Sequence, residues 1–140
     1  MKVVVIHESR TGNTRRAAEL IGGYFAESGS ETSVFPLGQI DLKALAEADL
    51  VCIGTWTDGL IVAGHRPGGA GRLRKLLPSL WDKDVVAFCT YAVNPGRTAN
   101  KLAELLEGLG ANVIGGGALH RAHLERDVST MVGALAPAAV

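Results

Sequence analysis

The chain has 140 residues, a formal net charge of zero and a hydrophobic fraction of 47%. This length and composition suit one globular domain over residues 1–140, without the long block of one charge sign that would favour nucleic acid or a membrane surface as the main partner. No apolar run approaches the roughly 20 residues of a membrane span. Cys52 and Cys89 lie within apolar runs, as expected for buried, unreactive thiols in a reducing compartment, so we expect a cytoplasmic protein.

The first predicted elements are a strand and a helix joined by a short polar segment. Residues 3–6 lack the polar alternation of a strand with one wet side, so this strand is predicted to be buried on both faces. Within 13–25, apolar residues recur at the spacing of one helical face. The polar segment between them therefore lies where a strand leads into a helix N-terminus.

Strand and helix patterns continue to alternate along the rest of the chain. The expected strands are 31–37, 50–54, 85–89 and 111–114, and the expected helices are 42–48, 71–77, 98–109 and 124–135. Five strands with intervening helices predict an α/β fold with a doubly wound, five-stranded parallel sheet. Ligands of such sheets bind beyond the carboxyl ends of the strands, so the loops after the first, third and fourth strands should share one crevice.

The loop after the first strand has the composition of an anion site. Ser9, Thr11, Asn13 and Thr14 offer polar groups beside the unpaired N–H groups of a helix N-terminus, and Gly12 lets the backbone approach a ligand closely. An ordinary helix cap is the alternative, although a cap needs one such residue. The Walker loop and the GxGxxG dinucleotide motif are both absent here. The segment therefore predicts a phosphate site of another kind.

The loops after the third and fourth strands each carry one large aromatic residue. They are Thr55-Trp56-Thr57-Asp58-Gly59 and Thr90-Tyr91-Ala92-Val93-Asn94. Two aromatic planes across the crevice would hold a flat ring between them, and stacking contributes on the order of 1 kcal/mol per face. Alternatively, Trp56 and Tyr91 simply cover the edge of the sheet.

These segments together resemble the flavodoxin family over essentially the whole chain. Ser9-Arg10-Thr11-Gly12-Asn13-Thr14 is similar to the family's phosphate loop, Gly54-Thr55-Trp56 to its Thr-Trp loop, and Tyr91 to its ring-stacking tyrosine. The resemblance implies the strand order 2-1-3-4-5 and FMN as cofactor. It assigns the FMN phosphate to Ser9–Thr14 and the two sides of the ring to the two aromatic loops, with Asp58-Gly59 as a hinge beside the ring.

The sequence departs from the family pattern in its charge and in one loop. Flavodoxins are strongly acidic around the flavin, whereas this chain is neutral, so the second reduction of a bound flavin should be easier here. The segment 60–71 is apolar, then rich in glycine, then basic. It is either a lid with a docking rim for an acidic partner or the 2′-phosphate of NADPH, or a plain surface loop with a solvated basic face.

Three functions remain open. The first is an FMN-binding carrier of one or two electrons, serving a redox partner protein or a small-molecule electron acceptor. The second is an NAD(P)H-dependent FMN enzyme of the quinone reductase type. The third is a binding module of the same shape without a cofactor. Leu60, Ile61 and Val62 could also pack against a second copy of the chain, forming a homodimer.

Overall fold

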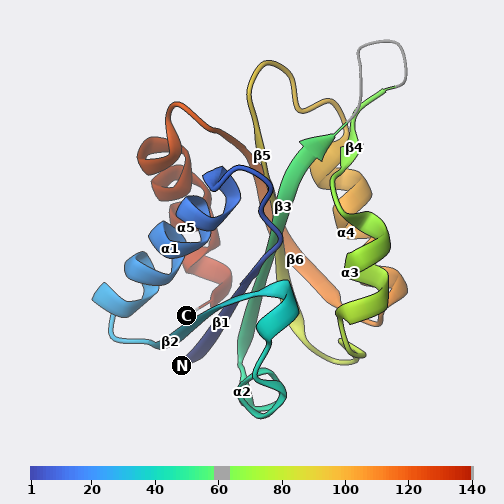
Figure 1. The fold of residues 1–140 in the computed structure, drawn as a ribbon. Helices are drawn as coiled ribbons and strands as arrows, with labels where there is room; N and C mark the ends of the chain where they lie inside the picture. Colours follow the sequence, from blue (N-terminus) through green and yellow to red (C-terminus); the bar gives the residue numbers. More distant parts are fainter. Residues whose placement is uncertain (59–63, 140) are drawn as a thin grey trace.

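The alternating sequence pattern forms alternating strands and helices in the computed structural model, which describes residues 1–58 and 64–139 (Figure 1). A short 3₁₀ turn, Leu37–Gln39, follows the second strand. The other elements, in chain order, are β1 (Lys2–His7), α1 (Asn13–Glu27), β2 (Glu31–Pro36), α2 (Leu42–Glu47), β3 (Leu50–Asp58), β4 (Arg66–Pro67), α3 (Ala70–Leu76), β5 (Asp84–Tyr91), α4 (Thr98–Gly108), β6 (Asn112–His120) and α5 (Leu124–Ala139).

The central sheet has the predicted topology. Its strands lie in the order β2-β1-β3-β5-β6, and all four neighbouring pairs along it are parallel. Because β5 and β6 are the fourth and fifth predicted strands, the expected order 2-1-3-4-5 is confirmed. The two-residue strand β4 was not predicted, and it pairs antiparallel with the end of β3.

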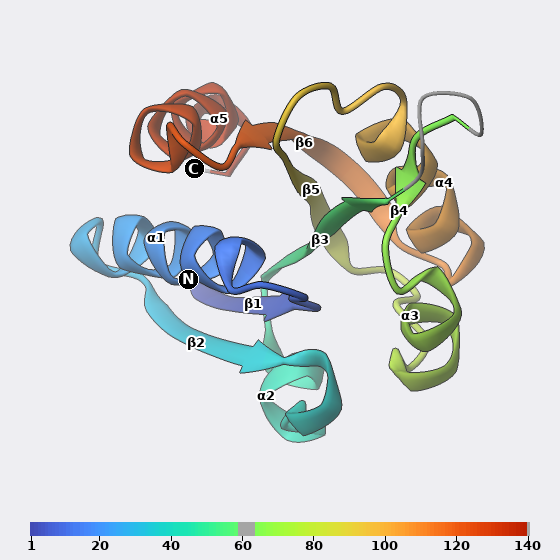
Figure 2. The same ribbon diagram turned by 45° about the horizontal axis from the view of Figure 1, so that its top comes forward.

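Helices cover both faces of the sheet, as Figure 2 shows. The side chains of Val3 and Val5 pack into the core beneath α1 and α5. Those of Val4 and Ile6 pack into the second core, beneath α2, α3 and α4. This division explains why β1 is apolar at successive positions, since each side of the strand faces a buried core.

The strands β3 and β5 extend further toward their carboxyl ends than the sequence pattern indicated. β3 continues through Thr55, Trp56 and Thr57 to Asp58, and β5 continues to Tyr91. The expectation that these residues lie in loops is therefore wrong. Pairing of β3 with β5 and with β4 extends the strand beyond its apolar run, and Thr and Trp are good strand formers.

β6 shows the largest difference from the prediction, which ended this strand at Ile114. The strand instead runs through Gly115, Gly116 and Gly117 as far as His120. A Cβ at Gly116 would lie 1.8 Å from the carbonyl oxygen of Ala87, and the φ of this glycine is +152°. Glycine is therefore required for β6 to approach β5 at this point.

Candidate functional site

A cavity of about 250 Å³ lies at the carboxyl edge of the sheet. Its walls come from the loop after β1, the ends of β3 and β5, and the turn after β6. The lining residues are Arg10, Thr11, Asn13, Thr14, Trp56, Thr57, Thr90, Tyr91, Ala92 and Arg121. All but Arg121 are predicted site residues, so the structure brings the three predicted segments together in one cavity.

The loop between β1 and α1 is folded by its own small residues. Gly12 precedes the helix with a left-handed φ of +97°, a conformation that favours glycine. Its N–H donates to the Ser9 hydroxyl oxygen at 3.0 Å, and the N–H of Arg15 approaches the same oxygen at 3.4 Å. Ser9 and Gly12 therefore shape the loop and do not line the cavity.

Several donors of this loop are unpaired. Within the described part of the chain, the backbone N–H groups of Arg10, Thr11, Asn13 and Thr14 have no acceptor. They lie at the N-terminus of the 15-residue helix α1, where the helix dipole attracts negative charge. The loop thus has the free donors that a phosphate group requires.

Three buried threonine hydroxyls have protein partners. The hydroxyls of Thr14 and Thr90 lie 2.8 Å apart, which joins the start of α1 to the end of β5. The hydroxyl of Thr55, a residue without exposed surface, donates to the carbonyl of Gly68 at 2.6 Å. Thr55 therefore fastens the segment before α3 to β3 and does not line the cavity.

Trp56 lies between the cavity and the segment that precedes α3. A Cβ at Gly68 would lie 2.0 Å from Cε2 of Trp56, so the indole rests directly on this glycine. The buried Nε1 of Trp56 and Oγ1 of Thr57 have no hydrogen-bond partner within the described residues. Buried polar atoms are usually paired, and the Trp56 Nε1 faces Gly68, since a Cβ there would lie 2.1 Å from it.

Tyr91 lies on another wall, and its ring is held by β6. The ring centroids of Tyr91 and His120 are 5.0 Å apart with an interplanar angle of 79°. His120 contacts His123 in turn, at 5.1 Å between centroids. His120, at the end of β6, thus packs edge-on against the tyrosine, and His123 packs against His120.

The remaining predicted site residues do not line the cavity. Asp58 ends β3 opposite Arg66. Val93 is 91% exposed, and the side-chain oxygen of Asn94 accepts a 2.8 Å hydrogen bond from the N–H of Gly96. Gly59, with the Leu60, Ile61 and Val62 of the predicted self-association surface, lies outside the described residues.

Arg121 was missed because the sequence pattern ended the last strand too early. In the structure its N–H donates to the carbonyl of Tyr91 at 2.9 Å, which fixes the turn after β6 at the cavity. Arg10 and Arg121 both line the cavity, and no described carboxylate does. The described lining therefore carries two positive charges and no negative one.

Three buried titratable groups of the sheet do not line the cavity. Burial, assisted by the nearby Arg15, lowers the pKa of His7, whose Nδ1 has no partner among the described residues. Burial raises the pKa of Cys52 to about 12 and that of Cys89 to about 11. Both thiols are free and protonated near neutral pH, which agrees with the prediction that they are buried and unreactive.

The described residues contain no helix that is both long enough and apolar enough to cross a bilayer. They also contain no cluster of three or more His, Cys, Asp or Glu residues that could hold a metal ion.

Comparisons with known proteins agree with the fold. Residues 4–115 match the family model for the flavodoxin domain. A flavodoxin of Nitratidesulfovibrio vulgaris is 30% identical over 124 residues, which cover 80% of this chain and 79% of that protein. The solution structure of two-electron reduced Megasphaera elsdenii flavodoxin matches with a TM-score of 0.76 at 22% identity, covering 98% of this chain and 97% of that one. Oxidised flavodoxin 2 of Bacillus cereus matches with a TM-score of 0.70 at 18% identity, covering 96% and 99%.

Proposed function

The chain belongs to the flavodoxin family, and we propose that it is an electron carrier that holds FMN in the cavity at the carboxyl edge of its sheet. Flavodoxins are FMN-binding proteins that pass electrons to redox partners. When bound, FMN supplies the redox chemistry, while the protein binds, orients and shields the ring. The observation that carries the proposal is the set of unpaired backbone N–H groups at the start of α1, which opens onto the same cavity as Trp56 and Tyr91.

The phosphate end of FMN is assigned to the loop between β1 and α1. The free N–H groups from Arg10 to Thr14 are hydrogen-bond donors, and the α1 dipole adds to the attraction for a dianion. Arg10 lines the same cavity. Ser9 keeps the loop in this shape, because its hydroxyl oxygen already accepts from the N–H of Gly12.

The ring end of FMN is assigned to the space between β3 and β5. Trp56 and Tyr91 line this space with flat side chains, and Thr57 lines it between them. Asp58 and Gly59 stay the proposed hinge beside the ring. Val93 and Asn94 stay proposed residues of the loop on the other side of the ring.

The cationic lining should affect the electron affinity of a bound flavin. Arg10 and Arg121 favour negative charge in the cavity, and no described carboxylate lining it opposes them. A reduced flavin that has gained negative charge is therefore less destabilised than it would be in an acidic cavity. This supports the expectation that the second electron enters at a higher potential than in an acidic flavodoxin.

A flavin enzyme that takes hydride from NAD(P)H is the second candidate. Arg66, in β4, and Arg74, in α3, favour it, because they form no ion pair with any described residue and would attract an anionic nucleotide. We further propose that residues 1–140 form one domain of a cytoplasmic protein, since the free buried cysteines suit a reducing compartment. The partner stays a redox protein or a small-molecule acceptor, and homodimer formation stays a prediction.

The first test compares FMN with riboflavin, which lacks the phosphate. Fluorescence quenching should show tighter binding of FMN, and Gly12→Ala should remove that advantage, because alanine is strained at the φ of +97°. Gly23→Ala is the matched control, since a Cβ there meets no atom within 4 Å. Binding of neither flavin would refute the proposal and leave a cofactor-free module.

The second test separates carrier from enzyme. FMN-loaded protein is reduced stepwise without oxygen, and separately mixed with NADPH. Reduction in steps by light, with no direct reaction with NADPH, is expected for a carrier. Rapid bleaching of the flavin bands by NADPH would instead establish the enzyme.

A further inference from the structure

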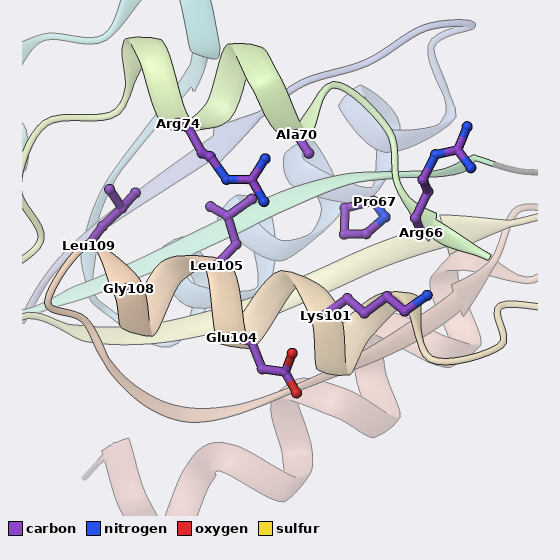
Figure 3. A pocket seen from close by; sticks show the side chains of 9 residues that line it. All are labelled: Arg66, Pro67, Ala70, Arg74, Lys101, Glu104, Leu105, Gly108 and Leu109. Carbon is purple, nitrogen blue, oxygen red and sulfur yellow. The ribbon is translucent and has the colours of Figure 1, made fainter. Parts of the chain in front are cut away.

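A second and larger cavity, of about 630 Å³, forms a groove between α3 and α4 (Figure 3). The strand β4 lies at one end of it. The groove is apolar where Pro67, Ala70 and Leu105 line it. It is separate from the flavin cavity, with which it shares no lining residue.

The groove is bordered mainly by positive charge. Arg66, Arg74 and Lys101 line it, together with one carboxylate, that of Glu104. Glu104 lies 3.8 Å from the guanidinium of Arg97, and Figure 3 shows it pointing away from the cations across α4. Arg66 and Arg74 form no ion pair with any described residue. Two of the three cations are thus available to a ligand.

The cations are spread along the groove. In Figure 3, Arg66 and Lys101 extend toward the β4 end, whereas Arg74 lies further along α3. The ammonium of Lys101 is held in place by a 2.6 Å hydrogen bond to the carbonyl of His65. One compact anion could not contact both ends at once, whereas a broad acidic surface could.

The β4 end of the groove adjoins the flavin cavity. Pro67, which lines the groove, is the direct strand partner of Thr57, which lines the flavin cavity. The Trp56 indole rests on Gly68, the next residue after Pro67. A molecule bound in the groove would therefore be separated from the proposed ring site only by the paired residues of β3 and β4.

We propose that this groove docks an acidic redox partner protein, which presents carboxylates around an apolar side chain. The apolar side chain would fill the space above Pro67 and Leu105, and the carboxylates would pair with Arg66 and Arg74. Complementary charge of this kind speeds association and fixes orientation more than it adds affinity. The inference rests on the proposed function, because the groove matters for electron transfer only if the adjoining cavity holds a flavin.

The test uses FMN-loaded protein and two labelled peptides, one alternating Glu and Leu and one alternating Lys and Leu. Fluorescence anisotropy should show binding of the Glu peptide, weakening as ionic strength rises, and no binding of the Lys peptide. Arg74→Glu should weaken binding about fivefold, because it replaces an attraction by a repulsion at an exposed position. Arg74→Lys should retain most of the binding.

Lys43→Glu is the matched control. It makes the same charge change on α2, at an exposed residue outside the groove. Equal weakening by Lys43→Glu and Arg74→Glu would overturn the proposal, as would failure of the Glu peptide to bind. Amide shifts of labelled protein should change along α3 and α4, and changes confined to α1 and α5 would also overturn it.

The flavin spectrum is recorded in each sample. Peptide binding by protein that takes up no FMN would refute the proposed function and leave a docking surface of another use. A bound flavin without peptide binding would refute the docking surface alone.

Discussion

Replacing Gly68 by alanine tests the contact that holds the Trp56 indole at the flavin cavity. A Cβ at position 68 would lie 2.0 Å from Cε2 of Trp56 and 2.1 Å from its Nε1. Nonbonded carbon atoms rest at about 3.5 Å, so the indole must move by about 1.5 Å. The φ of Gly68 is outside the left-handed region, so alanine meets no backbone strain and the effect comes from the indole.

Two consequences should appear together in the Gly68→Ala variant. Stacking on an aromatic face contributes on the order of 1 kcal/mol beyond area burial, so loss of the Trp56 face should weaken FMN binding about fivefold. Crowding of a packed site costs about 1–3 kcal/mol of the free energy of unfolding. Both effects arise from displacement of one side chain.

The measurements are a fluorescence titration with FMN, urea unfolding, and tryptophan emission. Trp81 is 78% exposed, so a Trp81→Phe background leaves Trp56 as the emitting residue. Gly71→Ala, in α3, is the control: a Cβ there meets no atom within 4 Å, so it should add about 0.5–1 kcal/mol of stability and leave FMN affinity unchanged. If Gly68→Ala changed neither emission, affinity nor unfolding, the indole would not rest on Gly68.

Three other predictions follow from separate parts of the structure. Gly116→Ala should lower the free energy of unfolding in urea by about 3 kcal/mol, because its Cβ would meet the carbonyl oxygen of Ala87 at 1.8 Å. In the control Gly117→Ala, the added Cβ meets no atom within 4 Å and should cost little stability. Similar losses in the two variants would contradict the close approach of β6 to β5. The lowered pKa of His7 means that the unfolded chain binds a proton that the folded chain resists, so stability should fall as pH decreases below the ordinary histidine value of 6.5. That part of the pH dependence should be missing from urea unfolding of His7→Leu, and its persistence would assign the slope to another group. Arg121→Glu should lower the potential of the second electron by about 40 mV, the equivalent of about 1 kcal/mol of Coulomb energy, and an unchanged potentiometric titration would place Arg121 too far from the ring to matter.

Much of the fold and of the proposed phosphate site could be predicted because both depend on residues close together in the sequence. The apolar run of β1, the helical spacing of α1 and the hydroxyls between them are local signals. They sufficed to place Arg10, Thr11, Asn13 and Thr14 in one cavity. Local signals did not give the strand order, which was predicted from the resemblance to the flavodoxin family.

Features that depend on tertiary pairing were not predictable. β6 contains Gly115, Gly116 and Gly117, and glycine is a poor strand former. Its length depends on its pairing with β5. Arg121 was therefore missed at the cavity. Thr55 has a hydroxyl of the kind that binds ligands, yet this hydroxyl donates to the carbonyl of Gly68. No local sequence pattern identifies that partner.

The buried bond between Thr14 and Thr90 has a consequence for how related sequences evolve. These residues lie 76 positions apart, and each hydroxyl is the other's partner. Loss of one hydroxyl leaves the other buried and unpaired at a cost of about 1–3 kcal/mol, whereas replacing both by apolar groups of the same shape can be nearly neutral. Selection should therefore retain both threonines or exchange both, so that these two columns of a family alignment covary.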